Sequence, residues 1–180
     1  MNVTHTRLDG VLLIEPTVFG DVRGFFFESW SERKYGAAGL QRAWVQDNVS
    51  RSGRGVVRGL HFQNPEAQAK LVSCLDGEVW DVVVDLRVSA PTFGQWEGFS
   101  LRVGRQLFVP AGFAHGFCVT SESAIVQYKC DAFWSPETER GVAWDDPDLA
   151  IAWPVNDPLL SAKDREYPRL RDVPREHLFA

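Results

Sequence analysis

The sequence is poor in sulfur and has no long apolar run. Its 180 residues include one Met and three Cys, with no C-x-x-C spacing. This odd number of cysteines, each in an apolar, strand-like context, favours buried free thiols over a disulfide scaffold or a thiolate zinc site. No stretch approaches the roughly 18 apolar residues of a membrane span, and the polar N-terminus lacks the apolar segment of a signal peptide. These absences predict a soluble, cytoplasmic protein.

Positive charge is also in short supply. The chain has 19 Lys and Arg against 24 Asp and Glu, a formal net charge of −5. A surface of that sign argues against nucleic acid and anionic membranes as partners, although a few local cations can still bind a small anionic ligand. The apolar content of 44% and the 12 Phe exclude a disordered chain. The length suits a single domain over residues 1–180.

Helical periodicity is scarce, whereas short strand-like runs recur along the middle of the chain. Turn-forming residues separate these runs, and Asp76-Gly77 predicts a type I′ hairpin between two of them. We expect a closed all-β sandwich or barrel, preferably a jelly roll. The expected strands cover residues 24–30, 43–50, 56–62, 70–75, 78–87, 94–102, 106–109, 116–120 and 124–130.

Two short helices are expected outside the strands. Ser29-x-x-Glu32 resembles a capping box and predicts a short N-terminal helix that stops near Gly39. The tail after Asp145 is rich in Pro and Asp, so we expect it to wrap the body in loops, with one short helix after Ser161.

The run 78–87 mixes apolar and acidic side chains. Trp80, Val82, Val84 and Leu86 share one face, while Asp81 and Asp85 interrupt the apolar pattern of the other. A barrel lumen that holds a polar ligand explains this mixture, and so does an ordinary sheet with one solvated side. Periodicity alone does not separate the two.

Two of the four histidines, His61 and His115, lie where a strand meets a turn. Such positions can point into the mouth of a β-barrel pocket, but each His can equally bond a backbone group. A metal site of the His-x-His kind is not supported, because Gln63 stands two residues after His61.

General acid–base chemistry is the other hypothesis for these residues. It needs a base, a carboxylate that orients it, a proton donor and a cation for a developing oxyanion. His61, Asp164, Tyr128 and Lys70 could fill these roles. Asp164 could equally complete the Ser161-x-x-Asp capping pattern, and Lys70 and Tyr128 could be plain strand residues, so spacing alone does not select the four.

A series of motifs runs in order from about Gly10 to Arg165. The motifs are Phe19-Gly-Asp-x-Arg23-Gly-Phe-Phe-Phe-Glu28, Gln46-Asp-Asn48, Arg58-Gly-Leu-His61-Phe-Gln63, Gln68-Ala-Lys70-Leu-Val, Pro91-Thr-Phe-Gly-Gln-Trp96, Pro110-Ala-Gly-Phe-Ala-His115-Gly-Phe, Tyr128-Lys, Ser135-Pro-Glu-x-Glu139-Arg, Trp144-Asp-Asp-Pro and Leu160-Ser-x-Lys163-Asp164. Together they resemble the dTDP-4-dehydrorhamnose 3,5-epimerase family.

The resemblance implies a cupin-type jelly roll, a homodimer, and catalysis with neither metal nor coenzyme. The implied reaction inverts C3 and C5 of dTDP-4-dehydro-6-deoxy-D-glucose to give dTDP-4-dehydro-L-rhamnose, a precursor of lipopolysaccharide and other surface glycans. By resemblance, His61 abstracts the proton, Asp164 orients His61, Lys70 stabilises the C4 oxyanion, and Tyr128 returns a proton on the opposite ring face.

The resemblance also implies a set of binding residues. An arm from Arg23 to Glu28 is expected to enter the site of the neighbouring subunit. Aromatic stacking is expected to hold the thymine, where Trp134 replaces the Tyr of many members and lacks its hydroxyl. The implied substrate-binding residues are Phe19, Arg23, Phe26, Glu28, Gln46, Asn48, Arg58, His115, Trp134, Glu139 and Lys163.

The sequence alone leaves three rival functions open. A relative that epimerises C3 only needs the same base. A metal-dependent cupin oxygenase shares the fold but requires iron for turnover. A non-catalytic sugar-nucleotide-binding module would keep Arg23 and Arg58 without needing a His–Asp pair and an opposed Tyr.

Overall fold

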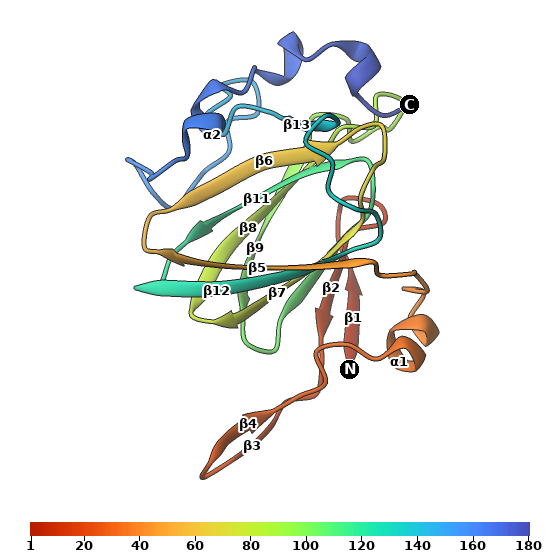
Figure 1. The fold of residues 1–180 in the computed structure, drawn as a ribbon, viewed down its shortest axis with the longest axis vertical. Helices are drawn as coiled ribbons and strands as arrows, with labels where there is room; N and C mark the ends of the chain where they lie inside the picture. Colours follow the sequence, from red (N-terminus) through yellow and green to blue (C-terminus); the bar gives the residue numbers. More distant parts are fainter.

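Two antiparallel β-sheets face each other in the computed structural model, which describes residues 1–180 (Figure 1). The six-stranded sheet contains, in order, β1 (Asn2–His5), β2 (Leu12–Glu15), β10 (Gln106–Val109), β7 (Lys70–Asp76), β12 (Ser123–Cys130) and β5 (Gln46–Gly53). The five-stranded sheet contains β13 (Glu139–Gly141), β6 (Val57–Gln63), β11 (Phe113–Val119), β8 (Glu78–Asp85) and β9 (Trp96–Arg102).

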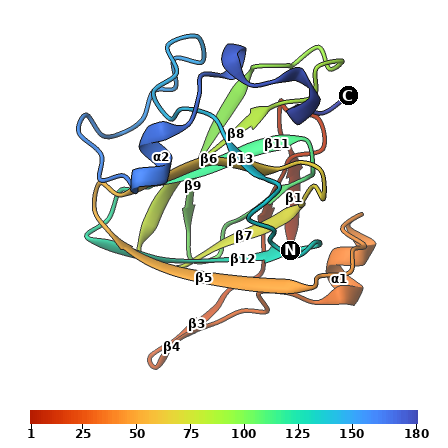
Figure 2. The same ribbon diagram turned by 45° about the horizontal axis from the view of Figure 1, so that its top comes forward.

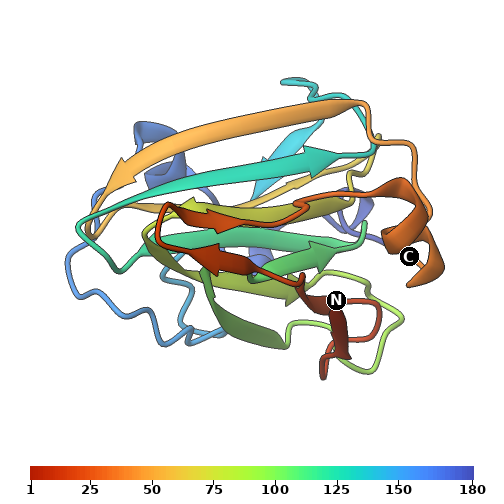
Figure 3. The same ribbon diagram turned by 90° about the horizontal axis from the view of Figure 1, so that it is seen from below.

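This arrangement confirms the all-β class. Seen from below, β5 in orange and β12 in teal run side by side at one edge of the six-stranded sheet (Figure 3). The two sheets share no strand, so the molecule is a sandwich and not a closed barrel.

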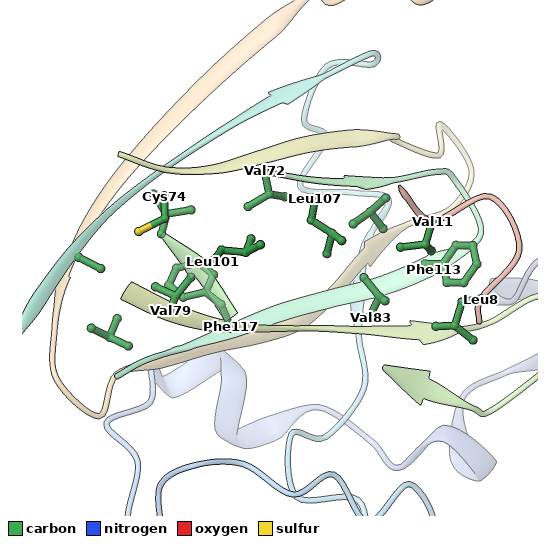
Figure 4. Close-up of a cluster of buried hydrophobic side chains, with 14 residues drawn as sticks. Leu8, Val11, Val72, Cys74, Val79, Val83, Leu101, Leu107, Phe113 and Phe117 are labelled. Atoms are coloured by element: carbon green, nitrogen blue, oxygen red, sulfur yellow. The ribbon is translucent and has the colours of Figure 1, made fainter. Parts of the chain in front are cut away.

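Apolar side chains from both sheets fill the space between them (Figure 4). Val79 and Val83 point from β8 into this core, where they meet Val72 and Leu107 of the opposite sheet. All three cysteines are free and buried, as expected.

The other face of β8 lies under the C-terminal tail. Val82, Val84 and Leu86 belong to this second cluster, and Trp80 packs edge-on against Trp153 of the tail, with ring centroids 5.4 Å apart. The predicted alternation of β8 is therefore confirmed. Asp81 and Asp85 are both fully buried, so the idea of a sheet with one solvated side is wrong. The Asp81 carboxylate bonds His115, and the Asp85 carboxylate bonds Arg87 and Thr92.

The C-terminal tail covers the five-stranded sheet, as the sequence predicts (Figures 1 and 2). It contains α2 (Ala162–Glu166) after Ser161, followed by two 3₁₀ turns, Leu170–Asp172 and Arg175–His177. Helix α2 packs on β6.

The N-terminal segment forms an arm. Strands β3 (Phe19–Asp21) and β4 (Gly24–Phe26) pair as a hairpin that projects from the body (Figure 1). The expected strand 24–30 is therefore too long, because residues beyond Phe26 leave the hairpin for α1 (Glu32–Ala37).

Helix α1 ends where the sequence predicts, but the cap is different. The hydroxyl oxygen of Ser31 accepts from the Lys34 amide, so Ser29 is not the N-cap. The carbonyl of Ser29 instead accepts from the side-chain amide of Gln106 and lies 3.2 Å from the hydroxyl oxygen of Tyr35. These tertiary contacts fix Ser29 ahead of the helix start.

The Asp76-Gly77 turn does not close a hairpin. Strands β7 and β8 lie in different sheets, because β7 already pairs with β10 and β12 and β8 with β11 and β9. Gly77 has φ +75°, and a Cβ there would lie 2.0 Å from the carbonyl oxygen of Ser123. The turn is thus a crossover that packs tightly against the β11–β12 connection. Strands β1, β2, β3 and β13 were not expected.

Candidate functional site

A cavity of about 230 Å³ opens at the end of the sandwich where β6 finishes and β7 begins. Both sheets line it: β6 and β13 form one wall, and β5, β7 and β12 form the other. The lining residues are Gln46, Asn48, His61, Phe62, Gln63, Gln68, Lys70, Tyr128, Trp134 and Glu139.

His61 reaches this cavity from the interior of β6, opposite His115 on β11 and Gly141 on β13. The approach of β6 to β11 is unusually close at Gly59, where a Cβ would lie 2.6 Å from the Cα of Gly116. Gly59 also has φ +135°, which other residues rarely adopt. The glycine of the Arg58-Gly-Leu-His61 motif therefore allows the close approach of β6 to β11 that places His61 in register.

Asp164 on α2 is the partner of His61. Its Oδ1 lies 2.5 Å from the His61 Nε2, while its Oδ2 accepts from the Ser161 hydroxyl at 2.7 Å. The Asp164 amide donates back to the Ser161 oxygen, so Asp164 completes the helix cap and orients the imidazole at once. Burial alone would raise the pKa of this carboxyl, but the hydrogen bonds from His61 and Ser161 outweigh it and hold the pKa below 3.8.

The pairing selects one form of the His61 ring. An ionised carboxylate only accepts hydrogen bonds, so Nε2 carries the proton in the neutral imidazole. Nδ1 is then the nitrogen with a free lone pair, as a general base requires.

Lys70 and Tyr128 stand on the opposite wall. The Lys70 Nζ lies 5.7 Å from the centroid of the Tyr128 ring, a cation–π distance. Burial lowers the pKa of Lys70, and the electrostatic interactions of Lys70 with Cys130, Glu139 and Asp81 oppose this only in part.

Burial has the contrary effect on Tyr128. It raises the pKa of the phenol above 10.0, against the opposing charge of Arg58. At neutral pH this wall of the cavity therefore offers a protonated phenol beside the Lys70 side chain, facing the His61 imidazole across the cavity.

His115 lies behind the cavity and does not line it. Its Nε2 is 3.0 and 2.9 Å from the two carboxylate oxygens of the buried Asp81. Burial raises the pKa of Asp81, with His115 and Lys70 opposing. The predicted substrate contact of His115 stays a prediction.

Polar residues at the mouth are already linked to one another. Gln46 donates to Asn48 at 3.0 Å and accepts from the backbone amide of Trp134. Lys163 and Glu139 form an ion pair at 2.8 Å. The Trp134 side chain is 54% exposed and separates the cavity from an open hollow of about 700 Å³ lined by Phe133 and Val45.

The single chain does not bring the arm residues to His61. Phe19 and Phe26 are 63% and 67% exposed on the projecting hairpin, and Arg23 pairs with Asp21 at its tip. Glu28 pairs with Lys34 of α1.

Arg58 is exposed on β6 and donates to the Ser52 hydroxyl at 3.1 Å. It lies outside the cavity lining, although its charge acts on Tyr128.

Sequence reasoning missed several residues of the site. Gln63 and Gln68 line the cavity, and Gln68 could have been found because it precedes Lys70 by two residues. Gln63 also ties the chain together, accepting from the Ser135 amide and donating to the carbonyl of Phe133. No group of three or more His, Cys, Asp or Glu side chains is placed to hold a metal ion. No helix is long and apolar enough to cross a membrane.

Known proteins share both this sequence and this fold. Residues 5–172 match the family model described as dTDP-4-dehydrorhamnose 3,5-epimerase. The chain belongs to this family. It is 55% identical over 177 residues to the dTDP-4-dehydrorhamnose 3,5-epimerase of Pseudomonas aeruginosa, covering 96% of this chain and 98% of the relative.

Two further relatives are also similar to this chain. The first is the crystal structure of a dTDP-6-deoxy-D-glucose-3,5-epimerase from Legionella pneumophila in complex with dTDP-4-keto-L-rhamnose. It is 46% identical, covers 99% of this chain and 97% of that one, and superposes with a TM-score of 0.95. The second is the dTDP-4-dehydrorhamnose 3-epimerase of Streptomyces niveus, 44% identical over 92% of this chain and 82% of the relative. This dTDP-4-dehydrorhamnose 3,5-epimerase family member is therefore an isomerase that acts on a sugar nucleotide.

Proposed function

We propose that this enzyme inverts C3 and C5 of dTDP-4-dehydro-6-deoxy-D-glucose to give dTDP-4-dehydro-L-rhamnose, with neither metal nor coenzyme. The observation that carries the proposal is one cavity with the His61–Asp164 pair on one wall and Lys70 and Tyr128 on the other. A base and an acid on opposite walls are what an inversion at carbon requires, because the proton must leave one face and return to the other.

The chemistry follows from the C4 ketone, which flanks both reacting carbons. His61 Nδ1 takes the proton from C3, the electron pair of the broken C–H bond forms the C3–C4 double bond, and the π pair of the ketone moves onto the C4 oxygen. Lys70 stabilises that oxyanion by its charge. Tyr128 then donates its phenolic proton to the opposite face of C3, the ketone re-forms, and solvent exchange restores both protonation states. The same steps at C5 complete the reaction.

The binding roles belong to the same proposal. Arg58 suits the diphosphate, since a guanidinium pairs with phosphate oxygens in a bidentate manner. The exposed indole of Trp134, beside the open hollow, offers a stacking face for the thymine. The remaining contacts to the sugar nucleotide are assigned to Gln46, Asn48, His115, Glu139 and Lys163.

The arm completes the site in a homodimer. Phe19, Phe26 and Arg23 extend from the body with their apolar and cationic side chains exposed, which supports a role in the cavity of a partner subunit. Glu28 stands at the base of the same segment. The free, buried thiols support a reducing, cytoplasmic compartment, from which the product would supply lipopolysaccharide or other surface glycans.

A second candidate function is epimerisation at C3 only, which the 44% identity to the Streptomyces niveus 3-epimerase favours. Incubating the 4-dehydro-6-deoxyglucose nucleotide with the enzyme in D2O, and locating deuterium by NMR, separates the two. We expect label at C3 and C5. Label confined to C3 after long incubation would contradict the double epimerase. Full activity in EDTA is expected as well, and an absolute requirement for iron would overturn the cofactor-free mechanism.

A further inference from the structure

Tyr167 packs against the catalytic base from the same short segment that supplies Asp164. It follows α2 directly, three residues after Asp164, and its ring centroid lies 5.6 Å from that of the His61 imidazole at an interplanar angle of 66°. Sequence reasoning did not single out this residue. One segment thus gives His61 both a hydrogen-bond acceptor, the Asp164 carboxylate, and an aromatic packing partner, the Tyr167 ring.

Gly141 leaves the space that the Tyr167 ring occupies. It is the direct partner of His61 in the β13–β6 register. A Cβ at Gly141 would lie 2.5 Å from three carbons of the Tyr167 ring, Cδ2, Cε2 and Cζ, a distance that real contacts do not show. The Tyr167 ring therefore packs directly against the backbone of β13 at Gly141. This contact sets the position of the ring relative to His61.

The polar end of Tyr167 takes no part in the hydrogen bonding of the protein. Its hydroxyl oxygen is buried and has no protein partner. Burial raises the pKa of the phenol, and the negative charges of Glu139 and Asp164 raise it further, so the side chain stays neutral. The contact of Tyr167 with His61 is therefore made by the aromatic ring and not by a hydrogen bond of the hydroxyl.

We propose that Tyr167 is a positioning residue whose ring, seated on Gly141, holds the His61 imidazole in the plane that keeps Nε2 on Asp164. This fixes Nδ1 as the basic nitrogen. The inference rests on the proposed role of His61 as base, and it adds a residue that touches neither substrate nor reacting atoms.

Replacing the ring tests the proposal. In Tyr167→Ala we expect kcat to fall at least about tenfold, since small misplacements of a catalytic group are costly, while KM changes less than twofold. Tyr167→Phe keeps the ring and loses only a hydroxyl without a protein partner, so it should retain kcat. Trp153→Ala is the matched control, because it removes another edge-on aromatic contact of the same tail, remote from the cavity. Native kcat in Tyr167→Ala, or an equal loss in Trp153→Ala, would overturn the proposal.

A spectroscopic readout separates positioning from general stability. We expect a downfield proton resonance from the His61 Nε2–H, identified by its absence in His61→Ala. It should persist in Tyr167→Phe and broaden through solvent exchange in Tyr167→Ala. An unchanged resonance in Tyr167→Ala would refute the role. This signal reports geometry and not turnover, so it stays informative even if another group proves to be the base.

Gly141→Ala offers a test that leaves Tyr167 in place. The new methyl group must displace the ring, so kcat should fall as in Tyr167→Ala. In the Tyr167→Ala background the same change should cause no further loss, because the collision is gone. Equal losses from Gly141→Ala in both backgrounds would show that the two residues act independently and would contradict the proposal.

Discussion

At the scale of single residues, Tyr128 is suited to give a proton and not to take one. Burial raises the pKa of its phenol, so the group is protonated throughout the neutral range. We predict that Tyr128→Phe keeps part of the deuterium exchange at C3 or C5, which His61 performs alone, but loses most net inversion. NMR of the sugar in D2O measures both quantities in one sample. Equal, native levels of the two would remove Tyr128 from the mechanism.

The charge on Lys70 predicts a pH dependence. Burial lowers the pKa of this ammonium group from 10.5, so the positive charge of Lys70 is lost at a lower pH than that of a free lysine. We therefore expect kcat to decline on an alkaline limb that begins below pH 10.5. Lys70→Arg keeps its charge to higher pH, so its rate should be lower overall but without that limb. An identical limb in the two enzymes would exclude Lys70 as its cause.

The sequence allowed the roles of some site residues to be predicted, but not the positions of all of them. His61, Asp164, Lys70 and Tyr128 could be assigned only by resemblance, because nothing in their spacing shows that α2 folds back onto β6. The bond of the His115 side chain to Asp81 was not expected for a related reason: Asp81 lies on the neighbouring strand, and strand pairing is a long-range property.

At the scale of elements, α1 is tied to the body through one buried hydroxyl. Tyr35 donates to the side-chain oxygen of Gln106 at 2.6 Å, and burial raises the pKa of Tyr35 to about 12. We predict that Tyr35→Phe lowers the free energy of unfolding by about 1–3 kcal/mol, because the buried Gln106 oxygen loses its donor. Urea unfolding measures this. A change under about 0.5 kcal/mol would show that the bond contributes nothing net.

The presence of a strand could be predicted where apolar and polar residues alternate strongly, but the partners of that strand in the sheet could not. The expected run 106–109 coincides with β10, and the run 124–130 falls one residue short of β12. The Asp76-Gly77 signal gave a turn correctly and a pairing wrongly, since turn chemistry is local while β7 and β8 are each paired on both sides by other strands. Strands of three residues, such as β3 and β13, are too short to show a period.

At the scale of the whole molecule, the acidic chain still places a few cations in or near the cavity. Lys70, Arg58 and Lys163 lie in or beside the cavity region, and Arg23 stands on the arm. A net charge of −5 thus coexists with local positive charge suited to one diphosphate and one transient enolate.

Subunit mixing tests whether the arm works in the partner's cavity. We predict that Arg23→Ala and His61→Ala homodimers are each nearly inactive. After exchange of subunits in equal amounts, about a quarter of the sites should combine an intact His61 with an intact arm, and activity should recover in that proportion. Recovery is read from the initial rate. No recovery, with heterodimers verified by mass, would mean that each arm serves its own chain.

The central claim is that His61 removes the proton from both carbons. The most direct measurement is deuterium exchange at C3 and C5 in D2O for His61→Ala, with dTDP binding measured in parallel and the exposed His5→Ala as control. We predict that His61→Ala slows exchange at both positions by about 10²–10⁴-fold or more while dTDP still binds, and that His5→Ala matches the native enzyme. Exchange at the native rate in His61→Ala would contradict the account.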